Sequence, residues 1–99
     1  MENKVLNLIG LAYRAHKIIL GGDTIVEALK NNLVSLVVMD KALTTDAARQ
    51  IKNKCDYHNI DLVLDFSTDE ISKAIGKTDV GVIGLTDTGF SKAIMKLLQ

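Results

Sequence analysis

The feature of this 99-residue sequence that restricts its fold most is a nearly continuous apolar run from Leu33 to Met39, which contains three valines. Strands that are exposed on one face alternate polar and apolar residues, and this run does not alternate. A short run rich in β-branched residues is typical of a strand that is buried on both faces of a sheet. We therefore expect a buried strand here.

Shorter strand segments and amphipathic helical segments alternate along the rest of the chain. Strands are expected at residues 17–20, 33–39, 62–64 and 80–85. Helices are expected at 4–15 and 23–32, from a cap at Thr44 or Thr45 through Cys55, from Ser67 to Gly76, and from Thr86 or Asp87 through Leu97. This alternation predicts a three-layer α/β/α sandwich with a four-stranded mixed sheet and about five helices.

Two helix starts carry the spacing of a capping box, in which a hydroxyl and a carboxylate three residues apart each bind a backbone N–H of the first turn. Ser67 and Glu70 have this spacing, and so do Thr24 and Glu27. The last helix is expected to turn four apolar residues inward, namely Phe90, Ala93, Ile94 and Leu97.

Composition limits the location of the protein and its partners. Twelve Lys and Arg balance twelve Asp and Glu, so the whole chain has no net attraction for a polyanion, and nucleic-acid binding needs a local patch. The single cysteine, Cys55, cannot form an internal disulfide. No signal peptide starts at Met1, and no apolar stretch approaches the ~18 residues of a membrane span. We expect one cytoplasmic domain, residues 1–99, with no membrane partner.

Groups that could catalyse a reaction or bind a metal are few. Cys55 and His58 could share a helix face, but a closed zinc site needs four ligands and no second pair is present. Asp40 follows the buried strand, as a phospho-acceptor of response-regulator receivers does, without their acidic pair; a turn aspartate is the simpler interpretation. Gly81 and Gly84 favour close helix packing over phosphate binding. We expect no enzyme, no metal and no cofactor.

The turn formed by Gly21 and Gly22 is the most informative part of the sequence. Glycines let the backbone approach a ligand closely, and the free N–H groups at the start of a helix attract anions such as phosphate. By spacing alone, however, a purely structural interpretation is favoured, in which Thr24 and Glu27 only cap the helix.

Six segments occur in the order and with nearly the spacing of a known family. They are Leu11-Ala-Tyr-Arg-Ala-His-Lys17, Gly21-Gly-Asp-Thr-Ile-Val-Glu-Ala-Leu-Lys30, Leu36-Val-Val-Met39, Asn53-Lys-Cys-Asp-Tyr-His-Asn-Ile60, Lys73-Ala-Ile-Gly-Lys77 and Leu85-Thr-Asp-Thr-Gly-Phe90. Over about nine-tenths of its length, from Leu8 to Leu98, the chain resembles the ribosomal L-seven-Ae superfamily of kink-turn RNA-binding proteins. It is most similar to the small bacterial YlxQ-type members.

The resemblance implies a two-part RNA site. In the family, the second helix starts with glycine, a small residue, asparagine, glutamate, two spacers and lysine, and the asparagine and glutamate read sheared guanine–adenine pairs of a kink-turn. The corresponding residues here are Gly21, Gly22, Asp23, Thr24 and Glu27. A second contact, which covers an extruded nucleotide, corresponds to Ile75, Gly76, Lys77 and Thr78. Lys17, Lys30 and Lys77 are expected to partly offset the acidic residues where they flank the same groove.

Three of these positions differ from the family pattern. Asp23 lacks the amide donor of asparagine, Thr24 is shorter than glutamate, and Glu27 reverses the charge of lysine. The leading hypothesis is a non-catalytic, ribosomal-type protein that recognises kink-turn or similarly bent, purine-mismatched RNA. Its expected partners are structured RNA of the ribosomal kind and ribosomal or other proteins, with no DNA.

The alternative is a protein-interaction or scaffold module on the same fold that has lost kink-turn binding. The charge around the second helix separates the two hypotheses. An acidic pocket that exposes Asp23 and Glu27, with no lysine nearby, would favour the scaffold, because carboxylates oppose the electrostatic attraction on which nucleic-acid affinity depends.

Overall fold

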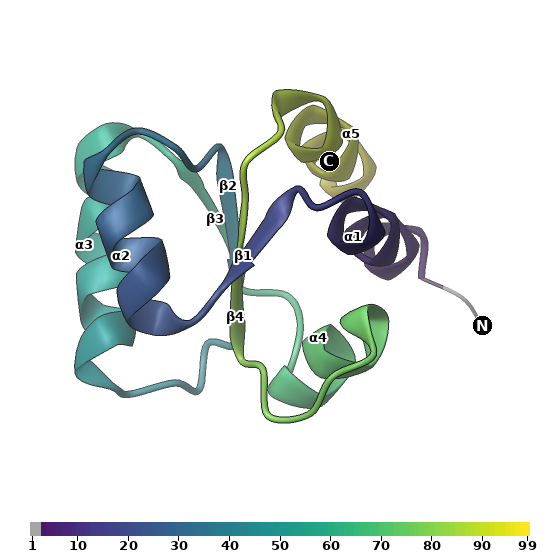
Figure 1. The fold of residues 1–99 in the computed structure, drawn as a ribbon, viewed down its shortest axis with the longest axis horizontal. Coiled ribbons are helices and arrows are strands. Elements are labelled where there is room, and N and C mark those ends of the chain that lie inside the picture. The colour runs from purple at the N-terminus through teal and green to yellow at the C-terminus, as the bar shows by residue number, and fades with distance from the viewer. Residues whose placement is uncertain (1–2) are drawn as a thin grey trace.

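The computed structural model describes residues 3–99, and these form a four-stranded sheet between two layers of helices (Figure 1). The helices are α1 (Lys4–Arg14), α2 (Gly22–Lys30), α3 (Asp46–His58), α4 (Thr68–Ile75) and α5 (Thr88–Leu98). The strands are β1 (Ile18–Leu20), β2 (Leu36–Met39), β3 (Asp61–Val63) and β4 (Val82–Leu85). Helices α2 and α3 cover one face of the sheet, and α1, α4 and α5 cover the other. The predicted α/β/α sandwich is confirmed.

The sheet is mixed, as predicted, and its strand order is β1-β4-β2-β3. Strand β4 pairs antiparallel with both β1 and β2, while β2 and β3 are parallel. All four residues of β2 are buried, which confirms the strand that the apolar run predicted. The two outermost strands are the three-residue strands β1 and β3.

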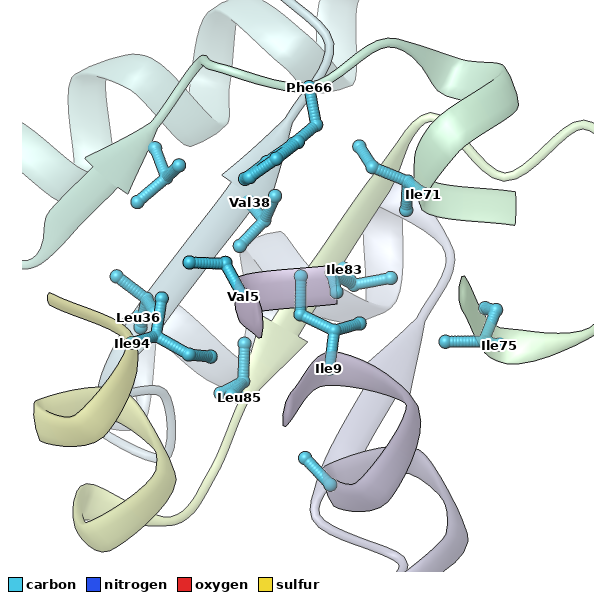
Figure 2. Close-up of a cluster of buried hydrophobic side chains, with 12 residues drawn as sticks. Val5, Ile9, Leu36, Val38, Phe66, Ile71, Ile75, Ile83, Leu85 and Ile94 are labelled. Carbon is cyan, nitrogen blue, oxygen red and sulfur yellow. The ribbon is translucent and has the colours of Figure 1, made fainter. Parts of the chain in front are cut away.

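The side chains of β2 alternate between two hydrophobic clusters. Figure 2 shows Leu36 and Val38 in the larger cluster, beneath residues of α1, α4 and α5. Val37 and Met39 point into the opposite cluster, where they are covered by α2 and α3. One strand therefore joins both halves of the interior.

Strands β2 and β4 start three and two residues later than predicted, and in each case other hydrogen bonds occupy the backbone. Helix α2 ends with Asn32 in the left-handed region (φ 57°), and the N–H of Leu33 donates to the carbonyl of Ala28 at 2.9 Å. This pattern, a Schellman motif, makes Leu33 part of the helix end and leaves its side chain 60% exposed. Before β4, the N–H of Val80 donates to the Ser72 hydroxyl at 2.8 Å and is not available to a strand.

Two of the predicted helix caps are confirmed, and the third is wrong. Thr45 caps α3, and Ser67 and Glu70 form the complete capping box at the start of α4. The capping box predicted for Thr24 and Glu27 is wrong, because α2 already begins at Gly22 and no side chain caps it. A capping threonine needs an extended backbone ahead of the helix, whereas Thr24 is inside the first turn.

Of the four residues that α5 was expected to bury, Ile94 is fully buried, Phe90 and Ala93 are half-buried, and the prediction for Leu97 is wrong. The inward stripe continues from Ile94 to Leu98, and neighbouring helical residues point ~100° apart. Leu97 therefore faces outward and is 45% exposed.

Within residues 3–99, no helix combines the length and apolarity that crossing a bilayer requires. The longest, α3, has 13 residues. The expectations drawn from the N-terminal end of the chain depend on Met1 and Glu2, which lie outside the described residues.

Candidate functional site

The two parts of the predicted site lie at one end of the sheet. Strand β1 runs antiparallel to β4, with Leu20 opposite Ile83. The start of α2, which follows β1, and the loop of residues 76–81, which precedes β4, therefore lie at the same end of the sheet, where β1 ends and β4 begins (Figure 1). The segment after β2 reaches the same end, because Asp40 donates its backbone N–H to the carbonyl of Gly81 at 2.8 Å.

Both glycines at the start of α2 have structural reasons to be glycine. Gly21 has φ 91°, a left-handed conformation that side chains disfavour. A Cβ on Gly22 would lie 2.7 Å from the Cβ of Ala47, so its absence lets α2 approach α3. No side chain caps α2, and its first N–H groups are free to bind water or an anionic ligand.

The residues predicted to read RNA on α2 are exposed. Asp23 and Glu27 are four residues apart on one side of the helix, and Thr24 is beside Asp23. The Glu27 carboxylate is 3.6 Å from the Lys30 ammonium. Asp23 borders a hollow of about 260 Å³ between α2 and α3, and its lining contains no Lys or Arg. The charge criterion therefore gives a mixed result: Glu27 has a lysine beside it, and Asp23 has none in its hollow.

The loop of residues 76–81 is held in shape by its own hydrogen bonds. Gly76 ends α4 in the left-handed region (φ 70°), and the N–H of Lys77 donates to the carbonyl of Ser72 at 2.9 Å. The buried Ser72 hydroxyl accepts from the N–H of Val80 and donates to its carbonyl at 3.1 Å. Lys77 and Thr78 are exposed in this fixed loop, and Ile75 is buried in the core beneath it.

The three predicted cations are not all at this end of the sheet. Lys17 precedes β1 at the opposite end, where its carbonyl accepts from the N–H of Thr86 at 2.9 Å. Lys30 lies at the far end of α2, about 12 Å along the axis from Gly22 at ~1.5 Å per residue. Only Lys77 shares the end with the start of α2.

Sequence reasoning missed Lys41 and part of the role of Asp40, the two residues that follow β2. Lys41 is exposed in the loop between β2 and α3. Asp40 is the turn aspartate that was expected, but its carboxylate also accepts from the backbone N–H and the hydroxyl of Thr68, both at 2.8 Å. These bonds tie the loop to the start of α4. Hydrogen bonds from the N–H groups of Ala42 and Thr68 hold the pKa of Asp40 below its ordinary value.

The groups considered for catalysis or metal binding have ordinary surroundings. Cys55 is buried among α2 and α3, and burial raises the pKa of its thiol to about 11. His58 contacts the ring of Tyr57 edge-on, with ring centroids 5.0 Å apart. Over residues 3–99 no three His, Cys, Asp or Glu side chains gather in a way that could hold a metal ion.

The fold and this end of the sheet define a small α/β/α sandwich that presents a helix start and a shaped loop at the same end of its sheet. The chain belongs to the ribosomal protein L7Ae/L30e/S12e/Gadd45 family, whose sequence profile matches residues 3–95. This confirms the resemblance seen in the sequence.

Individual relatives agree with this assignment. The chain is 30% identical over 92 residues to the RNA-binding protein YlxQ of Bacillus subtilis, covering 93% of this chain and 92% of that protein. It is 32% identical over 98 residues to the RNA-binding protein YlxQ of Enterococcus faecium, covering 99% and 94%. A protein of unknown function from Bacillus halodurans has the same fold, with a TM-score of 0.91, 32% identity and 98% of both chains covered.

The fold is also shared with a distant protein. The Giardia lamblia 15.5kD RNA binding protein superposes with a TM-score of 0.76 at 12% identity, covering 99% of this chain and 88% of that one. At this identity the match concerns the fold alone.

Proposed function

We propose that this chain, residues 1–99 acting as one domain, is a non-catalytic RNA-binding protein that recognises kink-turn or similarly bent, purine-mismatched RNA. The observation that supports the proposal most is that the start of α2 and the loop of residues 76–81 share one end of the sheet. Two relatives of about 30% identity over nearly their whole length are named as RNA-binding proteins.

Each part of the site offers a contact that suits RNA. At the start of α2, the uncapped N–H groups suit a phosphate, and the carboxylate of Asp23 and the hydroxyl of Thr24 can accept from amino groups of purines. In the loop, Lys77 offers a positive charge, and Thr78 a hydroxyl. The proposed contact residues are Gly21, Gly22, Asp23, Thr24, Glu27, Gly76, Lys77 and Thr78.

The remaining predicted residues are not proposed as RNA contacts at this end of the sheet. Ile75 holds the loop from the core and does not touch the RNA. Lys17 and Lys30 meet only RNA that extends to the opposite end of the sheet. With a formal net charge of zero, the protein recognises the RNA by its shape and a few base edges.

The test is a calorimetric titration of a standard kink-turn RNA, at two salt concentrations, against a duplex of the same length without the mismatched pairs. We expect binding of the kink-turn that weakens with salt and exceeds binding of the duplex at least tenfold. Equal affinity for the two RNAs contradicts the proposal.

A charge-reversal variant tests whether the RNA binds at the start of α2. Glu27→Lys is expected to strengthen kink-turn binding, because it replaces a carboxylate by an ammonium beside the phosphates. Asp56→Lys is the matched control, since it adds the same charge at an exposed position near the other end of α3. If wild type does not bind and Glu27→Lys does, this chain has lost kink-turn binding.

A second candidate function, a protein-interaction module, is favoured by the hollow beside Asp23, which no lysine lines. The same titration separates the two candidates, because a module of this kind binds neither RNA.

A further inference from the structure

A second surface of the protein carries the cations that the start of α2 lacks. Helices α1 and α4 pack closely where a Cβ on Gly10 would come within 2.8 Å of the carbonyl oxygen of Ala74. A hollow of about 350 Å³ follows this contact, and both Arg14 and Lys73 line it.

Arg14 and Lys73 each line a second hollow as well. Arg14 also lines a hollow of about 410 Å³ beside β1, together with Tyr13 and His16. Lys73 also lines a hollow of about 600 Å³ beside the loop, together with Lys77 and Thr78. Because neighbouring hollows share Arg14 or Lys73 in their linings, the three form a row along the surface from the proposed kink-turn site to the edge strand β1. We call it the α1–α4 groove.

The charges of the α1–α4 groove suit phosphates. Its lining holds the cations Arg14, Lys73 and Lys77 and two carboxylates, Asp69 and Asp79. Within residues 3–99, Arg14 and Lys77 form no ion pair. Lys73 is 3.1 Å from Asp69, but both side chains are 78% exposed, and an ion pair in water is weak enough to be exchanged for a phosphate.

The far end of the groove suits an unpaired base. Tyr13 is half-buried against the core and lines the hollow beside β1, as do Arg14 and His16. Bases of single-stranded RNA stack on aromatic rings and on arginine planes, whereas paired bases present no free face. An RNA single strand therefore fits this groove better than a duplex.

We propose that a single strand of RNA leaving the kink-turn site runs along the α1–α4 groove, where Arg14, Lys73 and Lys77 contact its phosphates and Tyr13 stacks on a base. This inference rests on the proposed function, since the groove begins at the loop of that site. It adds contacts at Tyr13, Arg14 and Lys73, which are not among the residues predicted to bind RNA.

The test compares a kink-turn RNA with the same RNA carrying a six-nucleotide single-stranded tail, at the 5′ or the 3′ end. For wild type, we expect one of the two tails to raise the affinity at least tenfold. Arg14→Ala and Tyr13→Leu should each lose most of this gain, and both should bind the RNA without a tail as wild type does. Lys52→Ala, which removes one exposed cation from α3 on the opposite face, is the matched control and should keep the gain.

The outcomes separate the two proposals. If the RNA without a tail binds and neither tail adds affinity, or if Lys52→Ala loses as much of the gain as Arg14→Ala, the groove proposal is overturned and the proposed function stands. If the RNA without a tail does not bind, the proposed function fails. The groove is then supported only if a single strand alone binds wild type and loses affinity in Arg14→Ala and Tyr13→Leu.

Discussion

Single polar residues hold the loops at the end of the sheet where the proposed site lies. The Ser72 hydroxyl fixes the loop of residues 76–81 from below, through both backbone groups of Val80. The Asp40 carboxylate joins the loop after β2 to Thr68, the first residue of α4. Since a buried hydroxyl or a carboxylate needs partners, each bond also restricts the backbone that supplies them. The proposed contact loop is therefore held in shape before any ligand binds.

Asp40 should make stability depend on pH. Its pKa is lower in the folded chain than in the unfolded chain, because the N–H groups of Ala42 and Thr68 donate to the charged form. The stabilisation is therefore fully present above the ordinary aspartate pKa of ~3.9 and is lost as the pH falls through the lower, folded value. In urea unfolding between pH 7 and pH 2, we expect Asp40→Asn to be less stable than wild type at pH 7.

The difference in the free energy of unfolding should shrink below about pH 4, where Asp40 of the wild type takes up its proton. Thr68→Val serves as a comparison, because it removes the hydroxyl donor and keeps the N–H of residue 68. It should retain part of the pH dependence. A constant difference between wild type and Asp40→Asn from pH 7 to pH 2 would show that the carboxylate contributes nothing through its charge.

At the scale of helices and strands, the contact of α1 with α4 depends on one glycine. A methyl group at Gly10 would lie 2.8 Å from a backbone oxygen of α4, which cannot move aside as a flexible side chain does. Overpacking of this kind typically costs ~1–3 kcal/mol, and alanine gains ~0.5–1 kcal/mol over glycine within a helix. We therefore expect Gly10→Ala to lower the free energy of unfolding by a net amount of about 1–2 kcal/mol.

Urea denaturation measures the effect of Gly10→Ala. The control is Asn7→Ala, an exposed position one turn earlier on the same helix, where only helix propensity changes and a slight stabilisation is expected. Should Gly10→Ala be as stable as Asn7→Ala, the two helices do not need the glycine in order to pack.

Element types could be predicted from the sequence because each segment has a strong period or cap. The predicted boundaries of these elements are wrong where another hydrogen bond, local or distant, occupies the backbone N–H. Leu33 belongs to the end of α2, through Ala28, and Val80 is bonded to Ser72. The predicted start of α2 is wrong because Gly21 adopts a positive φ that residue spacing does not reveal.

At the scale of the whole molecule, the two segments that sequence reasoning proposed as the site, the start of α2 and the loop after Ile75, lie at one end of the sheet, but the sequence did not indicate which cations accompany them. Lys17 and Lys30 are near these residues in sequence, but a strand and a helix carry them to the opposite end of the sheet. Arg14 and Lys73 are far apart in sequence and meet only because α1 packs on α4. The positions of these cations depend on strand direction and on helix packing, and local sequence patterns reveal neither.

The rate at which a thiol reagent labels Cys55 measures how often the whole protein unfolds. Its side chain is 2% exposed, and burial raises the pKa of the thiol to about 11, so a thiol reagent at pH 8 should react only after unfolding. A ligand that binds only the folded chain stabilises it by ~2.7 kcal/mol at a hundredfold excess over its Kd. Kink-turn RNA at that excess should therefore slow labelling about 100-fold.

The duplex without mismatched pairs, at the same concentration, is the control and should leave the rate unchanged. Rapid labelling of the free protein would mean that α2 and α3 separate locally, without unfolding of the rest.

The central position of β2 has a consequence for how the protein unfolds. Leu36 and Val38 serve one cluster while Val37 and Met39 serve the other, so neither layer of helices can leave without uncovering one side of this strand. The amide hydrogens of β2 should consequently exchange with solvent only through global unfolding, whereas those at the edge strand β1 can exchange through smaller openings. We therefore expect the two layers of helices, although separated by a sheet, to melt as one unit.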